Sequence, residues 1–188
     1  MDDPRSDEGL MLAYRDGDAT AFESLYARYR GRLYRYLAHQ APRHVDELYQ
    51  DIWLRVIAAR TGYGVSAKFS TWLFRIAHNR LIDHFRAQSR ARAVEYGQED
   101  DPDETLEKVA GPASAQPLDQ LARKRAAQRI AAAVAELPGP QQEAFLLAEE
   151  GGLSVEEIAQ ATGVGKETAK SRLRYALARL RRALEDLK

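Results

Sequence analysis

The sequence contains no cysteine and no long apolar run. Without cysteine there is no disulfide and no thiolate metal site, which fits a reducing compartment. The first ten residues, MDDPRSDEGL, are acidic and polar, whereas a signal peptide begins basic and continues apolar. No stretch approaches the roughly 20 apolar residues that span a bilayer. We therefore expect a cytoplasmic protein without membrane insertion.

Patterns for catalysis and metal binding are also missing. The histidines lack metal spacing such as HExxH. The segment GVGKET (163–168) begins like a phosphate-binding loop, but Gln160 stands where the first glycine is needed and Glu167 where Ser or Thr is needed. We therefore predict no catalytic residue, no metal and no cofactor, and hence a protein that is not an enzyme.

Charge is balanced overall but segregated along the chain. The 28 Lys and Arg residues equal the 28 Asp and Glu residues in number. Acidic residues gather in EYGQEDDPDETLEKVAGPASAQP (95–117), which also holds Pro, Gly and Ser and has no apolar period. Basic residues crowd into 68–92 and 166–182. We predict an acidic flexible linker over 93–117 between two small domains, and a polyanion as partner.

Residues 1–92 have the pattern of a helical bundle. Apolar residues recur every three or four positions. Asp18 lies near the start of one helix, and either Ser70 or Thr71 is placed to cap another. We expect helices that open near 10–13, cover 17–41 and 44–60, and resume from about Ser70.

Residues 118–188 have the pattern of a helix-turn-helix domain. Pro138-Gly139-Pro140 ends one helix, and Gly151-Gly152 closes the next. Ser154 and Glu157 have capping-box spacing, and Gly163 turns the chain into a long final helix. The fold class is therefore predicted to be all-α, with two helical domains.

The final helix is predicted to be amphipathic. Its inward stripe comprises Leu173, Leu177, Leu180 and Leu184, with Ala169 and Ala176 beside it. The opposite face is strongly basic, and the first turns of a recognition helix are those that enter the major groove. The alternative is a solvated basic face on an ordinary bundle helix.

A second basic cluster, in 68–92, is interleaved with aromatic residues. Aromatic planes among cations suit unstacked bases, and the glycine-bearing loop TGYGVSAKFS (61–70) could form a pocket for an extruded base. Aromatic residues at helical spacing are, however, more often core, and this applies to Trp72 and Phe74.

Three segments in this order resemble the extracytoplasmic-function (ECF, group IV) sigma factors of the sigma-70 family, which act with bacterial RNA polymerase. DELYQDIWLRVI (46–57) resembles the polymerase-binding helix, and FSTWLFRIAHNRLIDHFR (69–86) resembles the promoter-melting segment. Residues 137–184 resemble the carboxy-terminal promoter-reading domain. The resemblance implies a sigma2-like domain over 1–92, a linker over 93–117 and a sigma4-like domain over 118–188.

The resemblance also implies partners and site residues. Core polymerase would dock, through the clamp helices of its largest subunit, on Asp46, Glu47, Gln50, Asp51 and Trp53, although Trp53 could equally be core. Single-stranded minus-10 DNA would meet the loop 61–68 and Lys68, Phe69, Ser70, Trp72, Arg75, Asn79 and Arg80. Duplex minus-35 DNA would meet Lys166, Thr168, Lys170, Ser171, Arg172, Arg174 and Tyr175. An anti-sigma factor is the expected regulator.

Two positions depart from the family pattern, in which arginine is frequent. At Tyr175, either a phosphate contact is missing or Arg174 supplies it; at Lys170, lysine lacks the two-pronged contact that arginine makes to guanine. The acidic stretch 99–104 could imitate phosphate charge or serve only as a tether. The rival interpretations are a stand-alone helix-turn-helix regulator that binds duplex operators without polymerase, and a helical adaptor that binds only proteins.

Overall fold

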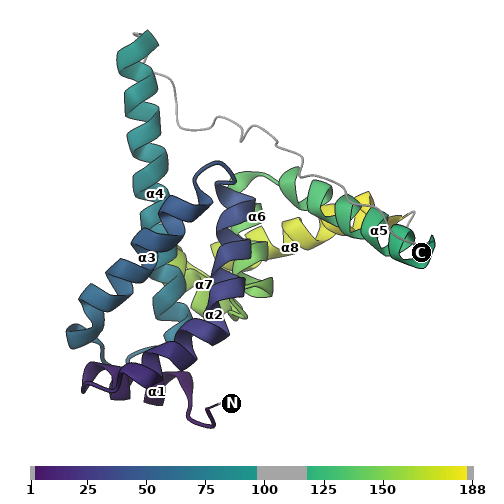
Figure 1. Cartoon of the computed structure of the whole chain (residues 1–188). Helices are drawn as coiled ribbons and strands as arrows, with labels where there is room; N and C mark the ends of the chain where they lie inside the picture. The colour runs from purple at the N-terminus through teal and green to yellow at the C-terminus, as the bar shows by residue number, and fades with distance from the viewer. Residues whose placement is uncertain (1–2, 97–117, 186–188) are drawn as a thin grey trace.

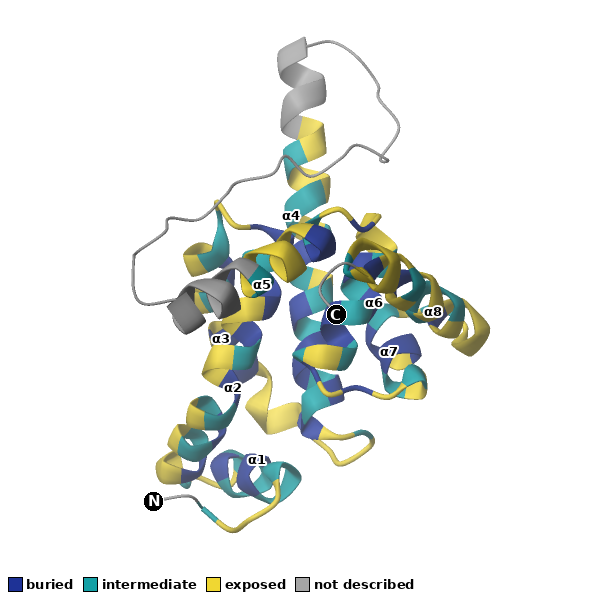
Figure 2. Ribbon diagram, turned by 90° about the vertical axis from the view of Figure 1, so that its right-hand side faces the viewer, coloured by how far each residue is buried: buried dark blue, intermediate teal, exposed yellow. Residues whose placement is uncertain are grey.

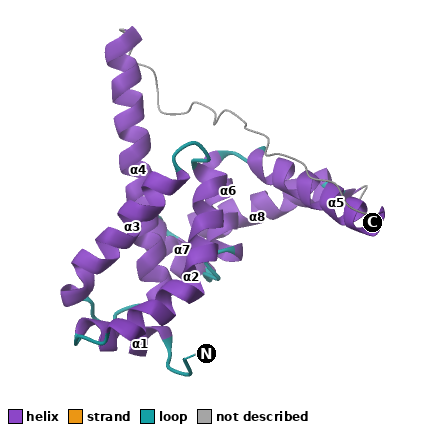
Figure 3. Cartoon of the chain, viewed as in Figure 1, coloured by secondary structure: helices purple, strands orange, loops and turns teal. Residues whose placement is uncertain are grey.

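The computed structural model describes the backbone of residues 3–96 and 118–185, and the side chains of those residues outside 91–96 and 118–125. Within these ranges every regular element is a helix, as Figure 3 shows. The all-α prediction is therefore confirmed. No described helix is both long and apolar enough to cross a membrane.

The first unit, residues 3–96, contains four α-helices and one short 3-10 turn (Figure 1). α1 packs against α2, and α3 lies between α2 and α4. The elements are α1 (Asp7–Arg15), α2 (Ala19–Gln40), α3 (Val45–Ala59), η1 (Arg60–Gly62) and α4 (Phe69–Tyr96). α4 continues past residue 92, where the first domain was expected to end, and the rest of the expected linker, 97–117, lies outside the described residues.

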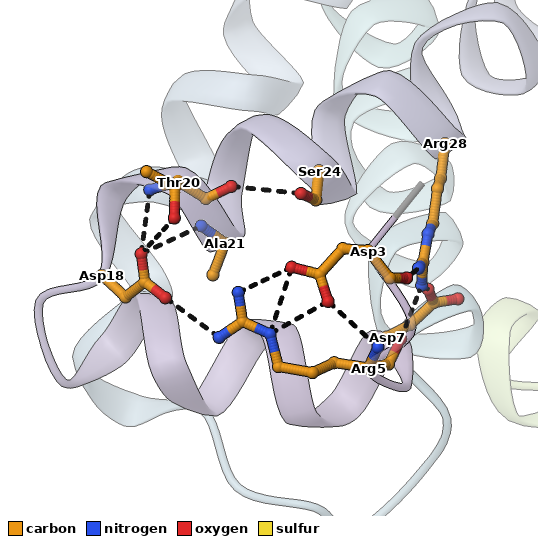
Figure 4. A network of polar contacts seen from close by, with 8 residues as sticks. All are labelled: Asp3, Arg5, Asp7, Asp18, Thr20, Ala21, Ser24 and Arg28. Atoms are coloured by element: carbon orange, nitrogen blue, oxygen red, sulfur yellow. Dashed lines mark hydrogen bonds and ion pairs between the residues drawn. The ribbon is translucent and has the colours of Figure 1, made fainter. Parts of the chain in front are cut away.

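A polar network joins the N-terminal segment to α2 (Figure 4). Asp18, expected near the start of this helix, is the N-cap of α2 and accepts hydrogen bonds from the backbone N–H groups of Thr20 and Ala21. Arg5 donates to the other Asp18 oxygen at 2.9 Å. The Thr20 hydroxyl, with Arg5, lowers the pKa of Asp18 to about 2. Arg28 reaches Asp7 at 2.6 Å, so the start of α1 is tied to α2.

The start of α4 differs from the prediction. The helix begins at Phe69, so Ser70 and Thr71 lie inside its first turn and neither can be its N-cap. The Phe69 N–H donates instead to Glu8 Oε1 of α1 at 2.8 Å. A carboxylate from a distant helix satisfies an N–H group that has no partner within its own helix.

The second unit, residues 118–185, forms the expected helix-turn-helix. Ser154 and Glu157 make a complete capping box, and Gly163 adopts a left-handed conformation with φ 70° at the turn. The buried Gln142 side chain donates to the Val134 carbonyl at 3.0 Å, which joins the first two helices. The elements are α5 (Leu118–Ala135), α6 (Gly139–Glu149), α7 (Val155–Thr162) and α8 (Lys166–Ala183).

The inward face of α8 is narrower than predicted. Ala169, Ala176 and Leu180 are buried, and Leu173 and Leu184 pack against the core. Leu177, expected in the stripe, is 41% exposed. Small alanines let α8 lie close to α6 and α7, and Figure 2 shows how much of α8 remains exposed.

The two units pack against each other. α7 lies along α4, and α6 approaches α2. At the end of α6, Arg32 Nε donates to the Glu150 carbonyl at 2.6 Å. Gly152, two residues after Glu150, has φ 63°, and a Cβ there would lie 2.7 Å from Arg32 Nη2. The sequence left this arrangement open, because no local pattern reports contacts across a linker.

The left-handed turn between α7 and α8 yields a stability prediction. Gly163→Ala should lower the free energy of unfolding by about 1 kcal/mol, because a Cβ is strained at this φ. Urea denaturation followed by circular dichroism measures the loss. Gly62→Ala is the matched control, since both sites have open space but Gly62 has no positive φ. An equal loss of unfolding free energy at both sites would show that backbone strain at Gly163 is not the cause.

Candidate nucleic-acid interface

α8 presents a basic surface to solvent. Lys166, Thr168, Lys170 and Arg174 are exposed, whereas Ser171 and Arg172 are half-buried. Lys166 pairs with Glu156, which raises the pKa of Lys166, and Lys170 lies 3.8 Å from Glu167. Such exposed ion pairs contribute little stability and are readily exchanged for other anions. The expected minus-35 residues thus lie in the first three turns of one helix, outside its buried stripe.

Tyr175 forms a unit with its neighbour Arg174. The Arg174 guanidinium lies 5.0 Å from the centre of the Tyr175 ring, and its Nη2 donates to the Tyr175 hydroxyl at 3.3 Å. Tyr175 is 52% exposed. The Arg174 cation is therefore held over the ring of Tyr175.

The loop before α4 and the first turns of α4 enclose an aromatic cluster. Tyr63 and Phe69 are buried, with ring centres 6.4 Å apart. Trp72 packs edge-on against Tyr63 at 5.1 Å but is only half-buried. Burial raises the pKa of Tyr63 to about 12, and nearby Glu8 and Asp7 add to the shift. Phe69 was predicted to touch DNA; its ring is core and supports Trp72 from beneath.

A pocket of about 290 Å³ opens beside Trp72. Thr71 contributes a buried hydroxyl that makes no hydrogen bond to the described part of the chain. The lining residues are Gly64, Ser66, Ala67, Thr71, Trp72, Arg75 and Gln160. The loop 61–68 lines this pocket through Gly64, Ser66 and Ala67. Among the other residues expected to meet minus-10 DNA, Ser70 is half-buried, and Arg75 and Asn79 are exposed.

The Arg80 side chain is held in ion pairs with residues of α3. Its Nε donates to Asp51, and its Nη2 lies 3.4 Å from Glu47. Asp51 also lies 3.4 Å from Arg55. The structure therefore joins a residue expected to contact DNA to two residues expected to contact polymerase. A paired guanidinium on a side chain only 15% exposed is less available to phosphate than Arg75.

The expected polymerase-binding residues divide by exposure. Asp46, Glu47 and Gln50 are exposed on α3, and Asp51 is half-buried. Trp53 is 5% exposed and packs among aromatic rings, with Tyr26 at 5.0 Å and Phe22 at 5.7 Å. Of the two alternatives for Trp53, its burial and ring contacts favour the core.

Residues of the second unit lie beside the pocket and beside Lys68, and none of them was among the expected site residues. Gln160 of α7 lines the pocket, and Glu157 Oε1 lies 3.0 Å from Lys68 Nζ. These contacts join positions far apart in the chain, so no spacing in the sequence could have indicated them. Among the residues with described side chains, no three His, Asp or Glu side chains gather as a metal site would require.

Comparisons with known proteins match both units. Sigma-70 region 2 matches residues 22–91, and Sigma-70, region 4 matches residues 127–186. The ECF RNA polymerase sigma factor SigM of Mycobacterium tuberculosis is 32% identical over 182 residues, covering 96% of this chain and 85% of SigM. The chain belongs to the ECF sigma factors. It is thus a transcription initiation factor that binds core RNA polymerase and promoter DNA.

Two further relatives match this sigma factor over most of its length. The RNA polymerase sigma factor CarQ of Myxococcus xanthus is 32% identical over 179 residues, covering 94% of this chain and 97% of CarQ. The sigma factor RpoE of Bartonella quintana, solved in complex with the anti-sigma factor NepR, is similar with a TM-score of 0.65. Its identity is 26%, over 89% of this chain and 98% of that one.

In this sigma factor Phe69 is buried and Arg75 is exposed, and the stability of variants at the two positions tests this difference. Phe69→Ala should lower the free energy of unfolding by about 3–5 kcal/mol, because it empties a fully buried site. Arg75→Ala, on the exposed face of the same helix, should change it by less than about 0.5 kcal/mol. Chemical denaturation of both variants gives the values. A small loss for Phe69→Ala would place that ring outside the core.

Proposed function

We propose that this ECF sigma factor reads two promoter elements with separate surfaces and contributes specificity rather than catalysis. The observation that carries the proposal is the exposed basic face of α8, which directly follows the tight turn at Gly163. Helix-turn-helix proteins place this second helix in the major groove. Thr168, Lys170 and Arg174 project from its first turns, where base edges and phosphates are reached.

The region 2 surface takes the minus-10 element as a single strand. The pocket beside Trp72 offers an aromatic face for stacking and polar groups, including Thr71, for an extruded base. Exposed Arg75 and Asn79 continue the surface along α4. Phe69 acts indirectly, because it holds Trp72 in position from within the core.

The exposed part of α3 docks on core polymerase. Asp46, Glu47 and Gln50 present acidic and amide groups to this partner. The family resemblance implies that these groups meet the clamp helices of its largest subunit. Asp51 contributes less, since it already pairs with Arg80. Trp53 maintains the shape of α3 through its aromatic contacts.

An anti-sigma factor restrains this protein in the cytoplasm. The support is the similarity to RpoE of Bartonella quintana, which was solved with the anti-sigma factor NepR. Restraint of this kind acts by covering surfaces that polymerase or DNA needs.

Run-off transcription tests the function directly. Core polymerase should initiate at specific sites in a promoter library only when this protein is added, and aligned start sites should share two upstream elements. Core polymerase with a known sigma factor serves as the activity control. If no start site depends on this protein while the control is active, the stand-alone regulator becomes the better interpretation.

The recognition helix has a separate test. Lys170→Ala should lower initiation about tenfold at promoters with a matching minus-35 element, because one base or phosphate contact is lost. Arg181→Ala is the matched control: it removes the same charge from an exposed position near the end of α8. Scrambled minus-35 DNA should be transcribed equally by wild type and Lys170→Ala. Equal losses for both variants would indicate a general charge effect.

A further inference from the structure

One helix, α1, holds both ends of the loop that lines the pocket assigned above to the minus-10 strand. Glu8, in the first turn of α1, accepts a hydrogen bond from the Phe69 N–H at 2.8 Å. Arg15, the last residue of α1, donates from Nη1 to the Tyr63 carbonyl at 3.3 Å. Only residues 64–68 separate these two bonded positions. From this segment the pocket is lined by Gly64, Ser66 and Ala67.

α1 is a firm support for the loop, because it is itself fixed in the core. Leu10 and Met11 are fully buried, and Tyr14 is 8% exposed. At the start of the helix, Asp7 pairs with Arg28 of α2 at 2.6 Å. A shift of α1 would therefore break contacts in the core as well as the two bonds to the loop.

The backbone of the loop gains from support at its ends. Gly62 and Gly64 flank Tyr63, and glycine loses more conformational freedom than any other residue when a segment becomes ordered. A Cβ added at either glycine would have no neighbour within 4 Å, so packing restricts neither position. Bonds at the two ends limit the conformations of such a loop before DNA binds. They therefore lower the cost of ordering it around a base.

The bond to Glu8 also ties the first turn of α4 to α1. This turn begins at Phe69 and carries Thr71 and Trp72, which both line the pocket. The Trp72 and Phe69 ring centres lie 5.9 Å apart. α1 precedes residue 22, where the match to Sigma-70 region 2 begins, so this support comes from outside the matched segment.

We propose that Glu8 and Arg15 are positioning residues for recognition of the minus-10 element. Neither lines the pocket, but each holds the backbone at one end of the loop. The two bonds keep the loop and the first turn of α4 at the spacing that admits an extruded base. This inference rests on the proposed function of the pocket and names the residues that maintain its shape.

Selectivity among minus-10 sequences should depend on these bonds more than overall promoter affinity does. A base that enters the pocket needs the loop ordered around it and bears the cost of that ordering, whereas a base that stays outside bears none. Loss of a bond therefore weakens the correct sequence more than an incorrect one. The net contribution of one hydrogen bond corresponds to a change of about three- to tenfold.

Four variants separate the two bonds from other effects. Glu8→Ala removes the acceptor, whereas Glu8→Gln keeps a carbonyl oxygen that can accept from the Phe69 N–H. Arg15→Ala removes the donor to the Tyr63 carbonyl. Asp16→Ala is its matched control, because Asp16 lies 2.9 Å from Arg15, and its loss leaves the bond to the loop in place.

Promoter templates with a pre-melted minus-10 region isolate base recognition from melting. One template carries the minus-10 sequence that run-off transcription identifies, and companion templates carry a single substitution at each position of that sequence. Holoenzyme assembled from core polymerase and each variant initiates on these templates, and the ratio of the two initiation rates is the selectivity. Because one preparation serves both templates, a partly unfolded variant lowers both rates but leaves their ratio unchanged.

Glu8→Ala and Arg15→Ala should each lower the ratio about three- to tenfold at the position where wild-type selectivity is strongest. Glu8→Gln and Asp16→Ala should keep the wild-type ratio. Selectivity for the minus-35 element should be unchanged in all four variants, since the recognition helix α8 has no part in these bonds.

The fluorescence of Trp72 gives a second readout, which does not require polymerase. The chain has two tryptophans, so Trp53→Phe leaves Trp72 as the sole emitter. In this background Glu8→Ala should shift the emission to longer wavelength and increase its quenching by acrylamide, because the first turn of α4 is released from α1. Adding Glu8→Gln instead should leave both unchanged.

Two results would overturn the inference: a wild-type selectivity ratio in both Glu8→Ala and Arg15→Ala, or an equal loss of selectivity for the minus-35 element. A wild-type protein that shows no selectivity at any minus-10 position would instead overturn the proposed function of the pocket. The wild-type ratio and the variant ratios therefore distinguish the two failures.

Discussion

The first backbone N–H of α4 is held by a carboxylate from another helix, and much of the structure follows from that bond. Glu8 of α1 accepts from Phe69 at 2.8 Å. The bond ties the first turn of α4 to α1, and the apolar residues that recur at the 3.6-residue period decide which face of α4 turns inward. Phe69 points into the core, Trp72 borders the pocket, and His78 meets α6. α4 contacts α1, α3 and α7, so its phase also positions those helices.

Features that depend on neighbouring residues could be read from the sequence. The N-cap at Asp18, the capping box at Ser154 and the left-handed turn at Gly163 each involve groups within a few positions. The recurrence of apolar residues every three or four positions was enough to locate most helices, because a helix buries its apolar stripe whichever element packs against it. The basic face of α8 followed from the same period, and its exposure is as predicted for most of its cations.

Features that depend on distant residues could not be read in this way. Ser70 and Thr71 are good capping residues, but Glu8 takes the role from 61 positions away. Trp53 and Phe69 lie at spacings that suit either a surface or a core, and only the packed rings decide between them. Leu177 is apolar but exposed, because it lies outside the narrow strip of α8, centred on buried alanines, that packs against the core. The contact between the units is entirely of this second kind.

In the turn after α6, the choice of residue at position 152 is limited both by the local backbone and by a side chain of the other unit. Gly152 needs its positive φ for the local chain reversal, and it also leaves room for the guanidinium of Arg32 in the other unit. Of these two demands the backbone one is the stronger, because the guanidinium is the far end of a flexible side chain and can move aside. Asparagine, which tolerates left-handed backbone, is therefore the residue best able to replace glycine in this turn.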